Sequence, residues 1–270
     1  MQADSSVNGG GSGMINICRP NESKSCAACC GLYNVTDASS EALIPELRRR
    51  TRLFGDVPRK VDELSGFKEF VSDTCNLKQL DPDIHVCEFI GFLDFHEQMV
   101  GCMLHPCSSG NRGVDFRGLC HYGAMACKSF YCPAWMELPE RIKDVVAYVV
   151  PDWRVYGLVV TDVGFCLSIT GLIELRMGRE ISISELNAPI LKQKLLDILL
   201  LKDKLPMASD ARVRRSNYYV RKRWEATSGN DLLCYALESL SFTYDENLVT
   251  LDCKDLVMSR IVEFAELANK

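Results

Sequence analysis

The sequence lacks the features that would place it in a membrane or outside the cell. Its start, MQADSSVNGGGSG, has neither a basic residue nor an apolar core, so it is not a secretory signal peptide. The longest apolar stretch, at 145–160, is interrupted by Pro151, Asp152 and Arg154 and cannot span a bilayer. We therefore expect a cytoplasmic protein with no membrane partner, in which thiols stay reduced, and a disordered tail at 1–13.

The common signatures of nucleotide-binding proteins and hydrolases are also missing. There is no P-loop, no GxGxxG after a strand, no HExxH and no GxSxG, and no CxxxCxxC of the radical-SAM type. Asp94 and Glu97 are close in sequence, but nothing around them indicates catalysis. The net charge of −5 argues against a general nucleic-acid binder. No familiar motif therefore names a reaction.

Cysteine is abundant instead, and it is unevenly placed. Ten of the fourteen cysteines lie in two blocks of the first half. The first block holds Cys18, Cys26, Cys29 and Cys30. The second holds Cys87, Cys102, Cys107, Cys120, Cys127 and Cys132, together with all the histidines, His85, His96, His105 and His121. Thiols and imidazoles at short intervals are typical of a metal site, because a metal needs several such ligands around one point. Disulfides in a protein secreted by an unrecognised route are the alternative.

The segment Cys26-x-x-Cys29-Cys30 is the sharpest local signal. A two-residue gap lets the chain turn back so that both thiolates reach one ion, as in zinc knuckles and iron–sulfur loops. The side chains of adjacent residues diverge, so Cys30 would serve a second metal, another iron of a cluster, or a supporting position.

Four segments of the chain together repeat a known pattern. They are CAACC at 26–30, CEFIGFLD at 87–94, GCMLHP at 101–106 and CKSFYCP at 127–133. In order, spacing and flanking residues they resemble the YkgJ-like proteins, a family of zinc- or iron-chelating cysteine-cluster proteins, over residues 14–135. Lys128 stands where that family usually has arginine, and 107–126 is an insertion. The resemblance implies metal chelation, names no reaction and does not cover 136–270.

The resemblance and the insertion together give nine candidate metal ligands. They are Cys26, Cys29, Cys30, Cys87, Cys102, Cys107, Cys120, Cys127 and Cys132. Nine thiols suffice for two four-thiolate sites with one left over, so two zinc ions, or a 4Fe–4S cluster with a zinc or a second cluster, all fit. We favour an iron–sulfur cluster, with zinc as the close second, because aromatic residues flank the cysteines and would shelter a cluster from solvent. These aromatic residues are Phe89, Phe92, Phe116, Phe130 and Tyr131.

The remaining thiols and imidazoles have simpler interpretations. Isolated cysteines in apolar or helical contexts usually fill the core, which we expect of Cys75, Cys166, Cys234 and Cys253. Cys18 is open to either interpretation, and its eight-residue distance from Cys26 allows shared ligation. His105 and His121 lie beside cysteines and are secondary ligand candidates or hydrogen-bonded loop histidines; His85 and His96 are weaker.

The predicted fold class is mainly α. An irregular, metal-stapled, cysteine-rich module over 14–135 is followed by a compact helical domain over 136–270. Helices are expected in pieces over 39–70, then over 137–150, 152–177 and 231–240, and from Asp252 to the end. Ser182 and Glu185 have the spacing of a capping box for another helix, whose start Pro189 would kink or delay. Residues 242–251 suit a hairpin or an extended turn.

Two arginine-rich stretches complete the analysis. RVRRSNYYVRKRWE at 211–224 mixes cations and aromatics, and 212–224 could bind an anion or a protein partner, although a solvated basic face is the simpler interpretation. The same solvated face is expected of Arg48, Arg49, Arg50 and Arg52.

These observations favour a cytoplasmic metal-binding protein with a redox, sensing or metal-handling role. The alternatives are an enzyme that uses an open cluster iron, since some relatives with this cysteine pattern are associated with protein lysine methylation, or a structural zinc module that presents a basic surface to a partner.

Overall fold

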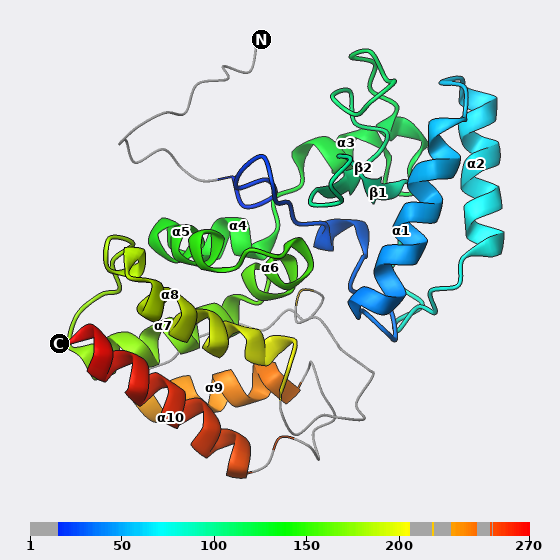
Figure 1. Ribbon diagram of the computed structural model, residues 1–270. Helices are drawn as coiled ribbons and strands as arrows, with labels where there is room; N and C mark the ends of the chain where they lie inside the picture. The colour runs from blue at the N-terminus through cyan, green and yellow to red at the C-terminus, as the bar shows by residue number, and fades with distance from the viewer. Residues whose placement is uncertain (1–15, 206–217, 219–227, 242–248, 250) are drawn as a thin grey trace.

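A computed structural model of the protein describes residues 16–205, 218, 228–241, 249 and 251–270 (Figure 1). The protein is mainly helical, as expected. The helices are α1 (Ser40–Gly55), α2 (Val61–Thr74), α3 (Gly123–Ser129), α4 (Pro133–Glu137), α5 (Glu140–Val149), α6 (Trp153–Val160), α7 (Val163–Met177), α8 (Pro189–Leu199), α9 (Gly229–Ser241) and α10 (Leu251–Ala268). Short 3₁₀ turns are η1 (Ala28–Cys30), η2 (Arg117–Leu119), η3 (Glu185–Asn187) and η4 (Leu200–Lys202). The strands are β1 (Ile90–Phe92) and β2 (Val100–Cys102).

The predictions for 1–13, for most of 242–251 and, except at Tyr218, for the basic stretch at 212–224 fall outside the described residues.

The cysteine-rich half is built around one small hairpin. Strands β1 and β2 pair antiparallel, with Gly91 opposite Gly101, and α1 packs against β1. The carboxylate of Asp94 closes the hairpin turn by accepting from the backbone amides of Gln98 (3.0 Å) and Met99 (2.7 Å). Asp94 is therefore a turn-forming residue, which is a common role of Asp. Apart from this hairpin, the regular structure in 81–132 is limited to the turn η2 and the short helix α3, in line with the lack of sustained helical periodicity in the sequence.

The second half is a stack of helices whose apolar side chains form the largest core cluster. The single helix expected over 152–177 is wrong, because two helices, α6 and α7, meet there at an 85° bend. Asp162 is the reason: its carboxylate accepts from the amide of Phe165 at 2.9 Å and caps a new helix. Pro189 begins α8, so the predicted delay is confirmed.

Among the described residues, no single helix is long and apolar enough to cross a membrane, and only the bent pair α6 and α7 reaches that length and composition.

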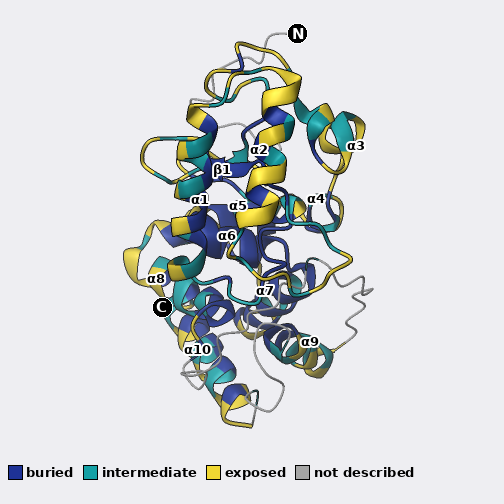
Figure 2. Cartoon of the chain, turned by 90° about the vertical axis from the view of Figure 1, so that its right-hand side faces the viewer, coloured by how far each residue is buried: buried dark blue, intermediate teal, exposed yellow. Residues whose placement is uncertain are grey.

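The two halves share part of their interior. Figure 1 places α1, α2 and the hairpin at one end, α7 to α10 at the other, and α4 to α6 between them. One hydrophobic cluster combines Leu32 and Leu43 of the first half with Trp153 and Leu158 of α6. The Tyr33 hydroxyl also donates to the Arg154 carbonyl at 2.9 Å. Figure 2 shows the buried residues concentrated on α5, α6 and α7, and the outer face of α2 exposed. The boundary at 135 stays a prediction, and α4 lies across it.

Candidate metal centre

The first cysteine block folds into a compact loop. The Cys26 amide donates to the Cys18 carbonyl at 2.9 Å, which brings these two residues side by side. The next residues form the turn η1, in which the Cys30 amide donates to the Ala27 carbonyl at 3.1 Å. Cys18, which the sequence left open, therefore belongs to the loop through a backbone contact.

Gly31 lets this loop approach the second block closely. Its φ is +81°, and a Cβ added there would overlap the His85 carbonyl oxygen. Just beyond this contact, the Cys87 amide donates to the Cys30 carbonyl at 2.9 Å. Only glycine can both turn in this direction and leave space for the neighbouring backbone, so Gly31 places Cys30 beside Cys87.

The hairpin and the insertion bring further thiols to the same region. Cys102 ends β2 opposite Ile90, and the Met103 amide donates to the Phe89 carbonyl at 2.9 Å. Farther along the chain, the sulfur atoms of Cys120 and Cys127 lie 3.2 Å apart. Eight of the nine predicted ligands, and Cys18 as well, thus come together from separate segments of the first half.

Eight of these thiols fall into two neighbouring groups, and Cys127 lies outside both. The hairpin group is Cys30, Cys87, Cys102 and Cys120, all of which belong to the hydrophobic cluster built on Phe54, Phe67 and Phe89. The junction group is Cys18, Cys26, Cys29 and Cys132. Within it, Cys26 and Cys132 pack on the core of the helical half, and Cys26 also packs with Cys30 on the cluster that contains Leu32 and Trp153. No disulfide joins any of these eight residues.

Burial and neighbouring thiols raise the pKa of most members of the junction group. Burial, together with the charges of Cys29 and Cys132, raises the pKa of Cys18 to about 12. The pKa of Cys26 is raised by burial and by the same neighbours, and that of Cys132 by burial and Cys29. Cys29 is the exception, because the thiol of Cys30 donates a hydrogen bond to it and lowers its pKa.

The hairpin group shows the same electrostatic pattern. The hydrogen bond with Cys29 and burial raise the pKa of Cys30, with contributions from Cys87 and Cys102. Burial raises the pKa of Cys87, and that of Cys102 to about 11, and each feels the charge of Cys120. These thiolates are costly in a buried site without a cation, and a bound metal ion would offset that cost.

The side chains do not form a closed coordination shell. Among the described residues, no three His, Cys, Asp or Glu side chains are arranged to hold a metal ion as they stand. The donor chemistry fits a thiophilic metal, since each group offers four soft sulfur ligands. Binding would require the thiols of a group to turn toward one point.

Other candidate ligands lie outside both groups. Cys107 is exposed, and its amide donates to Nδ1 of His105 at 3.2 Å. Burial and the charge of Arg117 lower the pKa of His105, which favours the neutral ring. The His121 ring stacks on that of His85, with centroids 4.1 Å apart. The ring of His105 therefore has a contact with its own loop, and the ring of His121 has one with His85.

The four cysteines that we expected in the core differ in their burial. Cys166 and Cys253 are buried, as predicted, and Cys75 is half-buried. Cys234 is exposed on α9, so its assignment to the core is wrong. Its helix presents that face to solvent.

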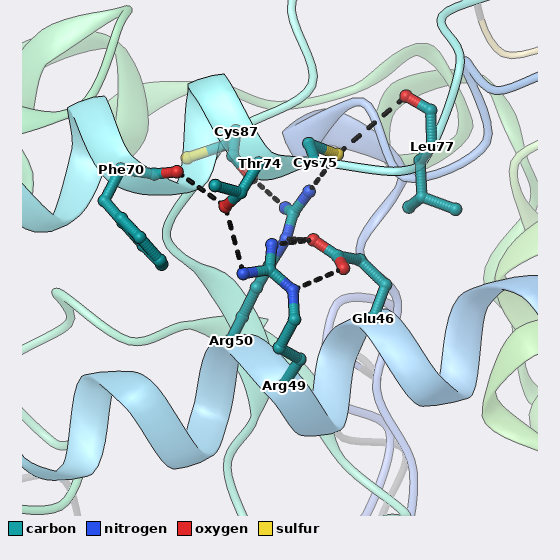
Figure 3. A network of polar contacts seen from close by, with 8 residues as sticks. All are labelled: Glu46, Arg49, Arg50, Phe70, Thr74, Cys75, Leu77 and Cys87. Atoms are coloured by element: carbon teal, nitrogen blue, oxygen red, sulfur yellow. Dashed lines mark hydrogen bonds and ion pairs between the residues drawn. The ribbon is translucent and has the colours of Figure 1, made fainter.

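The sequence analysis did not predict that Arg50 is buried beside the cysteines of this region. Its side chain is 2% exposed, so the solvated face expected of this arginine run is wrong at Arg50. Its Nη1 donates to the Cys87 carbonyl at 2.9 Å, and its Nε donates to Glu46 at 2.7 Å (Figure 3). Helical spacing is the only signal, since Glu46 and Arg50 are four residues apart and share a face with Leu43 and Leu47.

Comparison with known proteins adds no relative: no family model, no curated protein and no solved structure matches the chain.

Proposed function

We propose that the first half of the chain is a metal-binding module that uses cysteine thiolates, with an iron–sulfur cluster as the favoured centre and zinc as the second candidate. The observation that carries this proposal is the convergence of thiols from four separate segments, around residues 18–30, 87, 102 and 120–132. Packing alone has no reason to gather eight cysteines, whereas a thiophilic metal requires such a set.

The surroundings of the hairpin group favour a cluster over zinc. Phe89 is fully buried and packs in the cluster with Cys87 and Cys102, so that region is apolar; Phe92 is 5% exposed but packs in the neighbouring cluster, against Trp153. An apolar surrounding shields a cluster from solvent and tunes its potential. Phe130 and Tyr131 are largely exposed and contribute less. This setting suits a redox or sensing role in the reducing cytoplasm.

A structural zinc module is the second candidate. It is favoured by the place of Cys26 and Cys132, which pack on the core of the helical half. A closed four-thiolate zinc would then tie the two halves together without chemistry of its own.

Anaerobic purification followed by a visible spectrum and by iron, sulfide and zinc counts tests the proposal. A brown protein with about four irons and four sulfides per cluster supports the iron–sulfur centre. A colourless protein with stoichiometric zinc supports the structural alternative. If the reduced protein retains no metal and takes up neither iron with sulfide nor zinc, the proposal is wrong.

A further inference from the structure

We propose that Cys120 and Cys127 form a dithiol–disulfide couple, a site that exchanges two electrons with a low-molecular-weight disulfide such as oxidised glutathione. Their sulfur atoms lie 3.2 Å apart. A disulfide bond is about 2.05 Å long, so the two sulfurs need to approach by only about 1 Å to be joined. The inference goes beyond the proposed metal-binding function and does not depend on it, because the exchange needs no metal.

The two thiols differ in exposure in the way that such an exchange requires. Cys127 is exposed on α3, so a soluble disulfide can reach it. Cys120 is only 7% exposed and packs in the apolar cluster with Phe89. Thiol–disulfide exchange begins at an accessible thiol and is completed by a second thiol in contact with it. Cys127 therefore has the place of the attacking thiol, and Cys120 that of the resolving thiol.

Contacts on either side hold the two cysteines together. The Asp115 carboxylate accepts from Arg117 at 2.8 Å and from Lys128 at 2.9 Å, so one acid ties the turn η2 to the end of α3. Nη1 of Arg117 also donates to the Cys127 carbonyl at 3.4 Å. None of these contacts uses a sulfur atom. The approach of the two thiols therefore follows from the packing of α3 on η2 and does not require a bond between them.

Helix α3 can make the small movement that closure needs. None of its residues, Gly123–Ser129, is buried, and its first residue, Gly123, has a φ of +77°. A segment with few buried contacts shifts at little cost in packing. A displacement of about 1 Å at Cys127 would therefore leave the apolar cluster around Cys120 in place.

A second hydrogen-bonded thiol pair, Cys29 and Cys30, is not suited to the same reaction. Adjacent Cα atoms lie about 3.8 Å apart across a trans peptide bond, whereas disulfides join Cα atoms about 4.4–6.8 Å apart. A bond between neighbouring cysteines therefore strains the backbone. Cys120 and Cys127 are seven residues apart and escape this constraint.

The reaction balances as a two-electron exchange. The Cys127 sulfur attacks one sulfur of oxidised glutathione, whose S–S bond breaks and releases one glutathione thiol. The Cys120 sulfur then attacks Cys127 in this mixed disulfide, which forms the Cys120–Cys127 bond and releases the second glutathione. The two thiol protons of the protein end on the two glutathione molecules, so the protein is oxidised and the glutathione disulfide is reduced. The same bond would withdraw two candidate ligands from a metal, a consequence that rests on the proposed function.

Equilibration of the reduced, metal-free full chain with glutathione buffers of increasing oxidised fraction tests the couple. Partial burial and the Cys120 thiol raise the pKa of Cys127 to about 12, so exchange is slow and each sample is followed until it no longer changes. After acid quenching and alkylation of the free thiols, trypsin releases residues 118–128 as one peptide that contains Cys120, Cys127 and no other cysteine. In the oxidised form this peptide carries no alkyl group and is two hydrogen atoms lighter than the free dithiol.

We expect this peptide to be half oxidised in a buffer about tenfold more reducing than any other cysteine linkage in the chain requires, because the fold has already brought its two sulfurs together. In urea the advantage should disappear. If the 118–128 disulfide forms no earlier than other linkages in the folded chain, the proposal is overturned. Metal counts play no part in this readout, so its failure leaves the proposed function standing.

Single variants test the two roles. Cys120→Ser should trap a stable glutathione adduct on Cys127, whereas Cys127→Ser should leave the buried Cys120 largely reduced. Cys107, which is exposed in the same insertion, is the matched control, and Cys107→Ser should leave the half-oxidation point of the 118–128 peptide unchanged. Equal adduct levels at the remaining thiol of the first two variants would contradict the assigned roles. If Cys120→Ser does not fold, as judged by its circular dichroism, the titration of the unmodified chain still decides whether the couple exists.

Discussion

Replacing Arg50 with Met is expected to destabilise the protein far more than the same change at Arg49. Both guanidinium groups bind the carboxylate of Glu46, at 2.7 Å, but Arg50 is 2% exposed and Arg49 is 23% exposed. Arg50 also donates to the Cys87 carbonyl at 2.9 Å and lies 3.0 Å from the sulfur of Cys75 (Figure 3). It therefore connects α1 with the segment that carries a hairpin-group cysteine.

The contacts set the expected magnitude. Removing one partner of a buried ion pair costs about 3–5 kcal/mol, because the other charge stays buried. Here Glu46 keeps Arg49, so the free energy of unfolding should fall by about 3 kcal/mol, including about 1 kcal/mol for the Cys87 carbonyl that loses its donor. Arg49→Met removes a more exposed pair and should cost about 0.5–1 kcal/mol. Arg50→Lys keeps the positive charge but loses the planar set of guanidinium donors, so its loss in free energy of unfolding should lie between those of the two Met variants.

Urea unfolding of the reduced, metal-free chain, followed by tryptophan fluorescence, measures these differences. With an m-value of about 2–3 kcal/mol/M, Arg50→Met should lower the midpoint by about 1–1.5 M. Arg49→Met should lower it by less than about 0.5 M. Equal midpoints for the two variants would refute the argument that burial decides the cost.

Three further predictions concern other parts of the molecule. Gly31 and Gly113 both have φ near +80°, but only at Gly31 would a Cβ overlap backbone, that of His85. Gly113→Ala should therefore cost about 1 kcal/mol and Gly31→Ala several times more; similar urea midpoints would contradict this. Burial raises the pKa of Cys166 above its ordinary 9.0, so the folded state holds that proton more tightly. The free energy of unfolding should then fall as the pH rises above about 9, and less steeply in Cys166→Ala; an unchanged slope between pH 8 and 10.5 counts against it. Burial alone would raise the pKa of Glu46, but two arginine hydrogen bonds bring it below 4.5. Stability should therefore be lost as the pH falls below about 4.5, with a shallower loss in Glu46→Gln, as acid unfolding curves would show.

Local sequence patterns predicted most of the helices and failed where a contact comes from elsewhere in the chain. The apolar stretch at 152–177 looks continuous, because nothing nearby shows that Asp162 caps a new helix and binds Lys202 from η4 at 2.7 Å. Arg50 looks like one member of an exposed run, since its burial depends on Cys87, 37 residues away. Residue spacing describes neighbours along a helix and carries no information on such distant partners.

The candidate site shows the same division between local pattern and tertiary contact. Spacing identified the CxxCC loop, but the place of Cys18 follows from a backbone hydrogen bond to Cys26 that no motif encodes. Cys107 and Cys120 were indistinguishable by composition, since both lie in the insertion. The structure separates them because Cys120 follows η2 into the apolar cluster, whereas Cys107 sits on an exposed turn.

The two thiol groups differ in what a bound metal would hold in place. Apart from Cys30, the hairpin group lies in a segment, 81–132, that has little regular structure and only a small core of its own. A metal there would supply folding free energy that apolar burial does not. The junction group lies where Cys132 precedes α4 and the Lys24 ammonium donates to the Ala147 carbonyl of α5 at 2.5 Å. A metal there would fix the loop at 18–30 against a helical core that is already well packed, so under the proposed function metal removal should affect the first half more than the second.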